Sequence, residues 1–288
     1  ETSVEKEVSG LKARQRALTC LTGALEGCAM ACLSGGLVQT LGDFLTQLAG
    51  PVQNDEADVE DDPDSDLDEQ LRDSALKTIQ VLLRSPLADD ASAVAERLII
   101  AQAAVQRRCA VADFADDEPR MGRVRSGLAT LPRSRRSICF SVLEAPLDAF
   151  RAITSTSKYL TNAASTFVQF AASCLHGESD PRCLQQILKL IHRLQQKLGP
   201  FFSGAAVFPA SEVFDSVAPY YPIQFTPPPN DVHGITREGL STALWNVLSY
   251  TENDAVLLKN GYETMASLSL GLFLDTLNPP PEDGPPSA

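Results

Sequence analysis

Apolar residues recur along this chain at steps of three and four positions, with polar residues between them. This spacing places the apolar side chains on one face of an α-helix. The clearest example lies in residues 181–198, where the apolar positions are Leu184, Ile187, Leu188, Ile191, Leu194 and Leu198. Similar stripes occur along most of the chain, and no stretch shows sustained alternation with a period of two. We therefore expect an all-α protein.

Short breaks separate these predicted helices. Gly35 and Gly36, then Gly50 and Pro51, then Ser85 and Pro86 each interrupt an apolar stripe. Short connections between helices favour antiparallel neighbours, and successive pairs that each bury a face against the next form an α-solenoid. We expect about five antiparallel pairs, with residues 1–50 as the first hairpin and residues 70–275 as the continuation of the solenoid. Residues 276–288, rich in proline, are predicted to be a disordered tail.

The negative charge of the chain is concentrated in one segment. Residues 54–69 hold ten of the 37 acidic residues and no basic residue, in a chain whose net charge is −13. A block of like charge with little to bury favours disorder, so we expect residues 51–69 to be an acidic linker. A docking tail for a basic partner is the alternative.

A second charged segment, residues 116–136, is predicted to be a basic loop. Its six arginines are interrupted by glycine and proline. Such a cluster can contact nucleic acid, but no aromatic residue alternates with these arginines. A solvated loop attracted to the acidic segment is the favoured interpretation, and direct nucleic-acid binding is not expected.

The segment 219–235 cannot belong to the helical pattern. Its three consecutive prolines at 227–229 lack backbone donors and hold the chain extended. Gly234 permits backbone angles that other residues resist, and Thr236 is a good N-cap for a following helix. Asp180 is likewise a good N-cap, for the helix that begins with Pro181. We therefore expect a stiff loop that leads into a capped helix.

This loop carries a resemblance to a known family. The string FTPPPNDVHGITREGL at residues 225–240, preceded by YYPI and further upstream by GESDPRCL, is similar to the N-terminal region of a large HEAT-repeat protein. That protein is the scaffold of the cytosolic iron–sulfur cluster targeting complex, in a family first named for methyl-methanesulfonate sensitivity and nucleotide excision repair. The similarity extends over residues 171–249. It implies that the solenoid is HEAT-like and that this chain is an N-terminal part of a longer protein.

The resemblance also implies a function. We expect a non-enzymatic adaptor that helps deliver iron–sulfur clusters to apo-proteins, among them DNA helicases and polymerases, in the cytoplasm and nucleus. In the family, C-terminal repeats that this chain lacks dock the partner assembly factors. A generic helical-repeat interaction module and a nucleic-acid-binding module are the alternatives.

The residue pattern itself offers no catalytic, cofactor or metal site. The seven cysteines form no C-x-x-C pair, and the odd number without paired spacing indicates a reducing compartment. Cys174, His176 and Cys183 match no zinc-binding spacing, and His233 with Asp231 has no nucleophile in a suitable context. The apolar runs are far shorter than the roughly 18 residues of a membrane span. We expect no cofactor, no enzymatic activity and no membrane contact.

Residues of the proline loop are the candidates for partner binding, because rigid loops on a scaffold lose little entropy when they bind. The alternative is that its aromatic residues only pack the loop onto neighbouring helices. The candidate residues are Tyr221, Phe225, Pro227, Pro228, Pro229, Asn230, Asp231 and His233.

Overall fold

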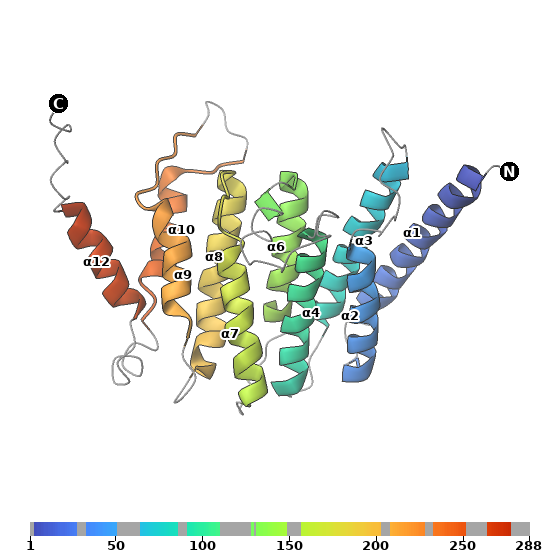
Figure 1. Ribbon diagram of the computed structural model, residues 1–288, viewed down its shortest axis with the longest axis horizontal. Helices are drawn as coiled ribbons and strands as arrows, with labels where there is room; N and C mark the ends of the chain where they lie inside the picture. The colour runs from blue at the N-terminus through green and yellow to red at the C-terminus, as the bar shows by residue number, and fades with distance from the viewer. Residues whose placement is uncertain are drawn as a thin grey trace, which may run out of the picture.

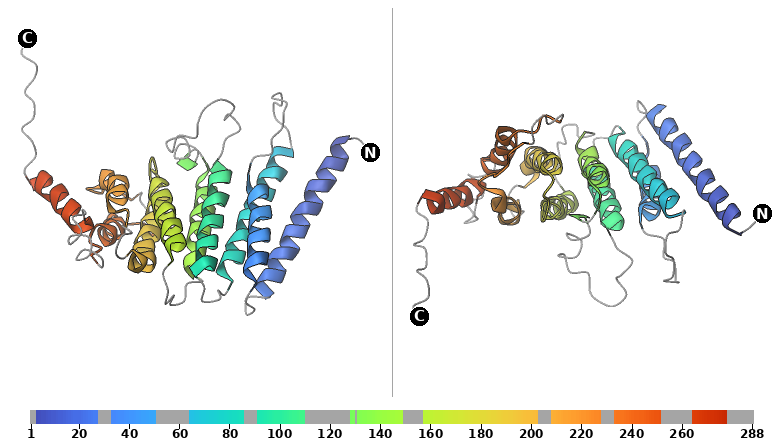
Figure 2. Two further views of the ribbon diagram at one scale, coloured as in Figure 1. Left: turned by 60° about the horizontal axis from the view of Figure 1, so that its bottom comes forward. Right: turned by 90° about the horizontal axis from the view of Figure 1, so that it is seen from above.

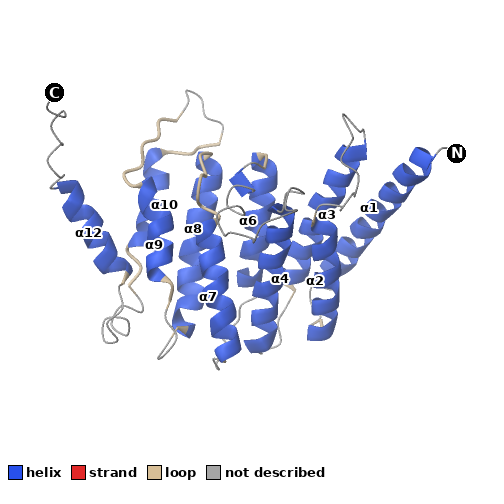
Figure 3. Ribbon diagram, in the orientation of Figure 1, coloured by secondary structure: helices blue, strands red, loops and turns tan. Residues whose placement is uncertain are grey.

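A computed structural model describes residues 3–27, 33–50, 64–85, 91–109, 128–129, 131–148, 157–202, 208–227, 233–251 and 264–277. Within these ranges the chain is helical and contains no strand (Figure 3). The α-helices are α1 (Ser3–Gly27), α2 (Gly35–Ala49), α3 (Asp64–Arg84), α4 (Ala91–Cys109), α6 (Arg133–Asp148), α7 (Lys158–Ser173), α8 (Pro181–Leu198), α9 (Ala210–Val217), α10 (Arg237–Leu248) and α12 (Met265–Leu277). Two short 3-10 helices, η1 (Gly199–Phe201) and η2 (Ala218–Tyr220), follow α8 and α9.

The helices form two parallel rows, as an α-solenoid requires. In the first row α1, α3, α6, α8 and α10 pack side by side, and in the second row α2, α4, α7, α9 and α12 do the same. The rows also pack on each other, most closely where α2 meets α3 and α4 meets α6. Successive helices run in opposite directions, and the termini lie at the two ends of the stack (Figures 1 and 2). The predicted all-α solenoid of antiparallel pairs is confirmed.

Local sequence signals set the ends of several helices. Asp180 is the N-cap of α8, where its side chain accepts a hydrogen bond from the backbone N–H of Arg182 at 2.9 Å, and Pro181 follows in the first turn. Ser157 caps α7 in the same way, through the backbone N–H of Leu160 at 3.1 Å. Each cap satisfies a donor that the first turn of a helix leaves without a partner. The α8 boundary predicted from the sequence is therefore confirmed.

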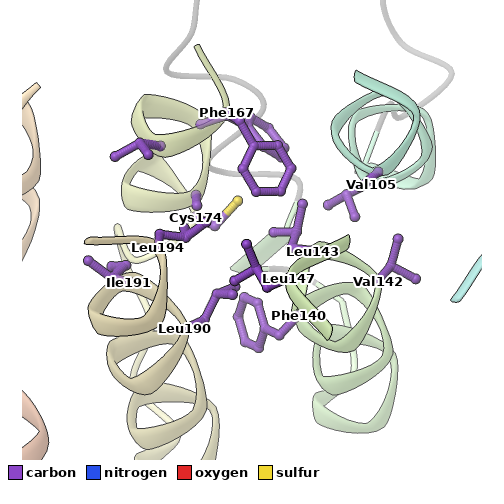
Figure 4. Packing of buried hydrophobic residues seen from close by; sticks show 14 of the residues in the cluster. Val105, Phe140, Val142, Leu143, Leu147, Phe167, Cys174, Leu190, Ile191 and Leu194 are labelled. Carbon is purple, nitrogen blue, oxygen red and sulfur yellow. The ribbon is translucent and has the colours of Figure 1, made fainter. Parts of the chain in front are cut away.

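The core lies between the two rows. All six residues of the α8 stripe are buried, and Figure 4 shows Leu190, Ile191 and Leu194 of α8 beside Phe140 and Leu147 of α6. Phe167 of α7 closes this cluster from the second row (Figure 4). No helix could bury such a face alone, so each helix depends on its neighbours.

Two charged segments differ from their predicted extent. Helix α3 begins at Asp64, so the last six residues of the predicted linker 51–69 are helical, and the remainder lies outside the described residues. Helix α6 begins at Arg133, so the end of the predicted basic loop 116–136 is its first turn. The cause is ion pairing between these two helix ends, described below.

Helices α1 and α2 each pack mainly on α3. Helix α6 continues through Pro146 to Asp148. In the described part of the chain, no helix is both long enough and apolar enough to cross a membrane.

The close approach of α2 and α4 gives a test of the packing. A Cβ added at Gly42 of α2 would lie 2.7 Å from Cδ1 of Ile100, which is buried in α4 and branched at Cβ. We expect Gly42→Ala to lower the free energy of unfolding by about 1–3 kcal/mol, because the added Cβ would also lie 3.0 and 3.1 Å from Cγ2 and Cγ1 of the buried Ile100. Urea denaturation measures this change.

Gly23→Ala is the matched control. Gly23 is exposed in the middle of α1, with no atom within 4 Å of an added Cβ, so this change should raise stability by about 0.5–1 kcal/mol through helix propensity. Equal effects of the two substitutions would contradict the close packing of α2 on α4.

Candidate functional site

The candidate site is the beginning of the proline loop and the helix ends that it covers. The loop leaves η2 and leads to α10 (Figure 1). Of the predicted binding residues, Tyr221, Phe225, Pro227 and His233 are described, whereas Pro228, Pro229, Asn230 and Asp231 lie outside the described residues. Their role in partner binding stays a prediction.

Tyr220 fixes the start of this loop. Its hydroxyl donates hydrogen bonds to the backbone carbonyls of Leu175 and Glu178, the latter at 3.1 Å, in the turn between α7 and α8. Burial raises the pKa of Tyr220 to about 12, so the phenol stays protonated and remains a donor at neutral pH. The loop is thereby tied to a segment more than 40 residues earlier in the chain.

Aromatic packing holds the next residue. The ring of Tyr221 packs edge to face on Trp245 of α10, with ring centroids 5.9 Å apart, and on Phe273 of α12, with centroids 5.6 Å apart. The rings of Trp245 and Phe273 stack on each other, with centroids 4.8 Å apart. Phe225 is half-buried against the core, whereas Pro227 and His233 are exposed. Tyr221 and Phe225 therefore pack the start of the loop onto the solenoid.

A hollow of about 400 Å³ lies between this loop and the N-terminal end of α8. Glu178, Tyr220, Tyr221, Phe225 and Leu240 are among the residues that line it. The lining combines the carboxyl group of Glu178, the hydroxyl of Ser179 and the amide of Gln224 with aromatic and aliphatic side chains. The hollow therefore offers both polar and apolar surface to a ligand.

The carboxyl group of Glu178 is already engaged by the protein. It accepts a hydrogen bond from the backbone N–H of Asp180 at 2.8 Å, and its other oxygen lies 3.3 Å from Nε of the buried Arg136. Burial nevertheless raises the pKa of Glu178 above its usual value. Nη1 of Arg136 donates to the carbonyl of Ala129 at 3.0 Å. These groups hold the α7–α8 turn to the start of α6, which is a structural role.

The predicted cap and turn before α10 are confirmed. Gly234 has a φ of +64°, a conformation that residues with a side chain rarely adopt. The Thr236 hydroxyl accepts a hydrogen bond from the backbone N–H of Gly239 at 3.0 Å. Leu240 is buried and Ile235 packs against the core, at the spacing of a hydrophobic staple.

The described cysteines, apart from exposed Cys20, are buried in the helical core. Cys109 of α4 and Cys139 of α6 share a thiol hydrogen bond, which together with burial raises the pKa of Cys139. Burial raises the pKa of Cys183 to about 11. Among the described residues, no group of three or more His, Cys, Asp and Glu side chains is placed to hold a metal ion. Cys28 and Cys32 lie outside those residues.

The arginines at the start of α6 face carboxylates of α3. Arg135 lies 3.2 Å from Glu69 and 3.6 Å from Asp73, and buried Arg108 of α4 pairs with the same two carboxylates. The predicted attraction between the basic and acidic segments is confirmed for Arg135. Since Arg136 is buried against Glu178, only Arg133 of these arginines in α6 is exposed. Two of the three described arginines of this segment are thus engaged with carboxylates, whereas Arg120, Arg123 and Arg125 lie outside the described residues.

A second hollow, of about 420 Å³, lies between α4 and α7. The apolar stripes did not predict this hollow, because most of its lining residues lie between the stripe positions of the two helices. A signal was nevertheless present in the four-residue spacing of Gln102 and Gln106 and of Asn162 and Thr166, which puts each pair on one helix face.

Comparison with known proteins identifies the family. Residues 65–278, well over half of the chain, match the model of the MMS19 N-terminal family, which is described as a Dos2-interacting transcription regulator of RNA-Pol-II. The chain belongs to this family. The resemblance seen in the proline loop is thereby confirmed.

Individual relatives match over shorter segments. A human protein, MMS19 nucleotide excision repair protein homolog, is 40% identical over 107 residues, which is 36% of this chain and 10% of the human protein. The homologue of the same name from Xenopus laevis is 37% identical over 122 residues (41% of this chain, 11% of the relative), and that from Arabidopsis thaliana is 30% identical over 116 residues (40% and 10%). The aligned segments thus span about a tenth of each relative. No solved structure matches the chain.

Family membership and fold together support a scaffold. The names of the relatives refer to nucleotide excision repair, and the family description refers to transcription. A helical-repeat architecture presents long surfaces and is typical of proteins that bind other proteins.

The anchoring of the loop by Tyr220 can be tested directly. We expect Tyr220→Phe to lower the free energy of unfolding by about 1–3 kcal/mol, since two buried carbonyls lose their donor. Thermal or urea denaturation measures the loss. Tyr159→Phe is the control, because Tyr159 is exposed and its hydroxyl has no partner among the described residues. An unchanged free energy of unfolding in Tyr220→Phe would contradict the anchoring role.

Thiol alkylation tests the burial of the cysteines. In native protein at pH 8, iodoacetamide should modify Cys20 and leave Cys183 unmodified, because Cys183 is 1% exposed and its pKa of about 11 leaves almost no thiolate. Peptide mass spectrometry measures both sites, with denatured protein as the control in which both react. Similar native rates at the two cysteines would show that Cys183 is accessible.

Proposed function

We propose that this chain is the binding part of a non-enzymatic adaptor for iron–sulfur protein assembly. The adaptor would help bring cluster-assembly factors to apo-proteins, among them DNA helicases and polymerases, in the cytoplasm and nucleus. The observation that carries this proposal is the family match over residues 65–278 together with the loop motif at 225–240. The iron–sulfur cluster is cargo in this proposal and needs no ligand in this chain.

The architecture suits an adaptor that acts through its surfaces. Each row of helices exposes one side along the whole stack, so partners can bind at several places without competing. The carboxyl group of Glu178 is bonded within the protein, and Cys174 and Cys183 are buried. We infer that these three residues stabilise the fold. Binding and positioning of partners is therefore the activity that the geometry supports best.

The alternatives receive less support. A generic transport or trafficking solenoid would not be expected to carry the family's loop motif. A nucleic-acid-binding module would require free cations, whereas Arg135 and Arg136 are paired with carboxylates.

Affinity capture from cytosolic extract tests the proposal. With this chain as bait, we expect enrichment of iron–sulfur proteins or their assembly factors, identified by mass spectrometry. Iron-starved cells should yield more of the client proteins than iron-replete cells, because apo-proteins accumulate when clusters are scarce.

An unrelated helical protein of similar negative charge is the control bait, since it reports capture by charge alone. Recovery of the same proteins with both baits, or of no iron–sulfur protein from either extract, would contradict the adaptor function.

A further inference from the structure

The groove between α4 and α7 has the composition of a binding surface. Its lining residues are Ile99, Gln102, Ala103, Gln106, Tyr159, Asn162, Ala163 and Thr166, none of which is charged. Ile99 and Tyr159 are 42% and 50% exposed, so the groove presents both an aliphatic and an aromatic side chain to solvent. Depletion of charge and exposure of an aromatic residue are typical of the centre of a protein interface.

The two helices present their groove residues in matching order. From the N-terminal end, α4 offers Ile99, Gln102 and Gln106, and α7 offers Tyr159, Asn162 and Thr166, with the same steps of three and four. Helices α4 and α7 are neighbours in the second row and run in the same direction (Figure 1). The groove therefore has an apolar end, formed by Ile99 and Tyr159, followed by amide side chains. The small side chains of Ala103 and Ala163 leave room for a ligand between the two helices.

The amides of this groove are not engaged by the protein. Within the described residues, the side-chain amides of Gln102, Gln106 and Asn162 have no hydrogen-bond partner. Each amide offers both a donor and an acceptor, the same pair of groups that a peptide backbone offers. Gln195 of α8 shows such pairing within this protein, since its Nε2 donates to the backbone carbonyl of Val247 at 3.1 Å.

The spacing of the amides fits an extended chain. Residues four apart on a helix, such as Gln102 and Gln106, are separated by about 6 Å along its axis. An extended polypeptide repeats every two residues over about 6.6 Å, so it can present a peptide group to each amide in turn. A helical ligand has its own backbone groups satisfied and would leave these amides without partners.

We propose that the groove between α4 and α7 binds an extended, uncharged segment of a partner protein. The backbone of the segment pairs with Gln102, Gln106 and Asn162, and one bulky apolar side chain rests on Ile99 and Tyr159. Nucleic acid does not fit, because the groove holds no cation to meet a phosphate. The inference rests on the proposed function in so far as the partner is a protein that the adaptor recruits.

A peptide selection on the intact chain tests the groove. A random 12-residue library displayed on phage is selected against the chain, and the enriched peptides are synthesised with a fluorophore. We expect peptides that are poor in charge and contain an aromatic or large aliphatic residue. Fluorescence anisotropy then measures their affinity for the native chain and its variants.

The variants separate the amide contribution from the apolar one. The triple change Gln102→Ala, Gln106→Ala and Asn162→Ala should weaken binding at least about tenfold, since several hydrogen bonds are lost together. Tyr159→Ala should also weaken binding, whereas Tyr159→Phe, which keeps the ring, should not. Asn246→Ala is the matched control, because Asn246 is an exposed amide on α10 in the first row. Circular dichroism verifies that each variant is folded.

Several outcomes would overturn the proposal. They are unchanged peptide affinity in the triple variant, selection of only strongly charged peptides, and failure to enrich any peptide. A dimer in sedimentation that the triple variant abolishes would identify a second copy of this chain as the occupant. Loss of DNA-oligonucleotide binding in the same variant would identify nucleic acid.

The affinity capture separates this inference from the proposed function. If the native chain and the triple variant capture iron–sulfur proteins equally and bind the peptides with the same affinity, the proposed peptide site is wrong and the adaptor function stands. If the native chain captures none but binds peptides through the groove, the adaptor function is wrong and the groove stands.

Discussion

Mutual burial of helix faces between the two rows is the constraint on which this structure depends. Each α-helix has one apolar stripe, and the stripe is covered only when helices of its own row and of the other row lie against it. The cluster around Phe140, Phe167 and Ile191 is the clearest case, because three helices contribute to it (Figure 4). Loss of any one helix would expose the faces of its neighbours to water.

The two rows differ in how polar groups join their helices. In the first row, Arg84 of α3 and Arg193 of α8 both pair with Asp148 of α6, and Arg193 also pairs with Glu144. Between described residues, no ion pair joins two helices of the second row. Exposed ion pairs add little stability, but several around one carboxylate fix the relative position of three helices. The second row keeps its outer side available, with the groove of α4 and α7 on it.

The described start of the proline loop shows how a segment without regular structure is held in place. Tyr220 binds backbone carbonyls of the preceding turn, and Tyr221 joins an aromatic cluster with α10 and α12. The prolines limit the conformations of the free chain, so little entropy is lost when these contacts form. The family motif is thus partly a packing motif, which is why its aromatic residues are half-buried.

The sequence by itself determined the features that depend on neighbouring residues. The apolar face of α8, its cap at Asp180, the glycine turn at Gly234 and the cap at Thr236 follow from spacing and local hydrogen bonding. The family was also readable, because the loop at 225–240 is a long irregular string.

Only the tertiary structure decided which long-range partners these residues meet. The acidic run predicted disorder up to Glu69, but Arg108 and Arg135 neutralise its end and α3 begins at Asp64. The same pairing converts the end of a predicted basic loop into the first turn of α6. Charge balance of this kind depends on residues far apart in the chain, so local pattern could not reveal it. The open groove between α4 and α7 likewise exists only once the helices lie side by side.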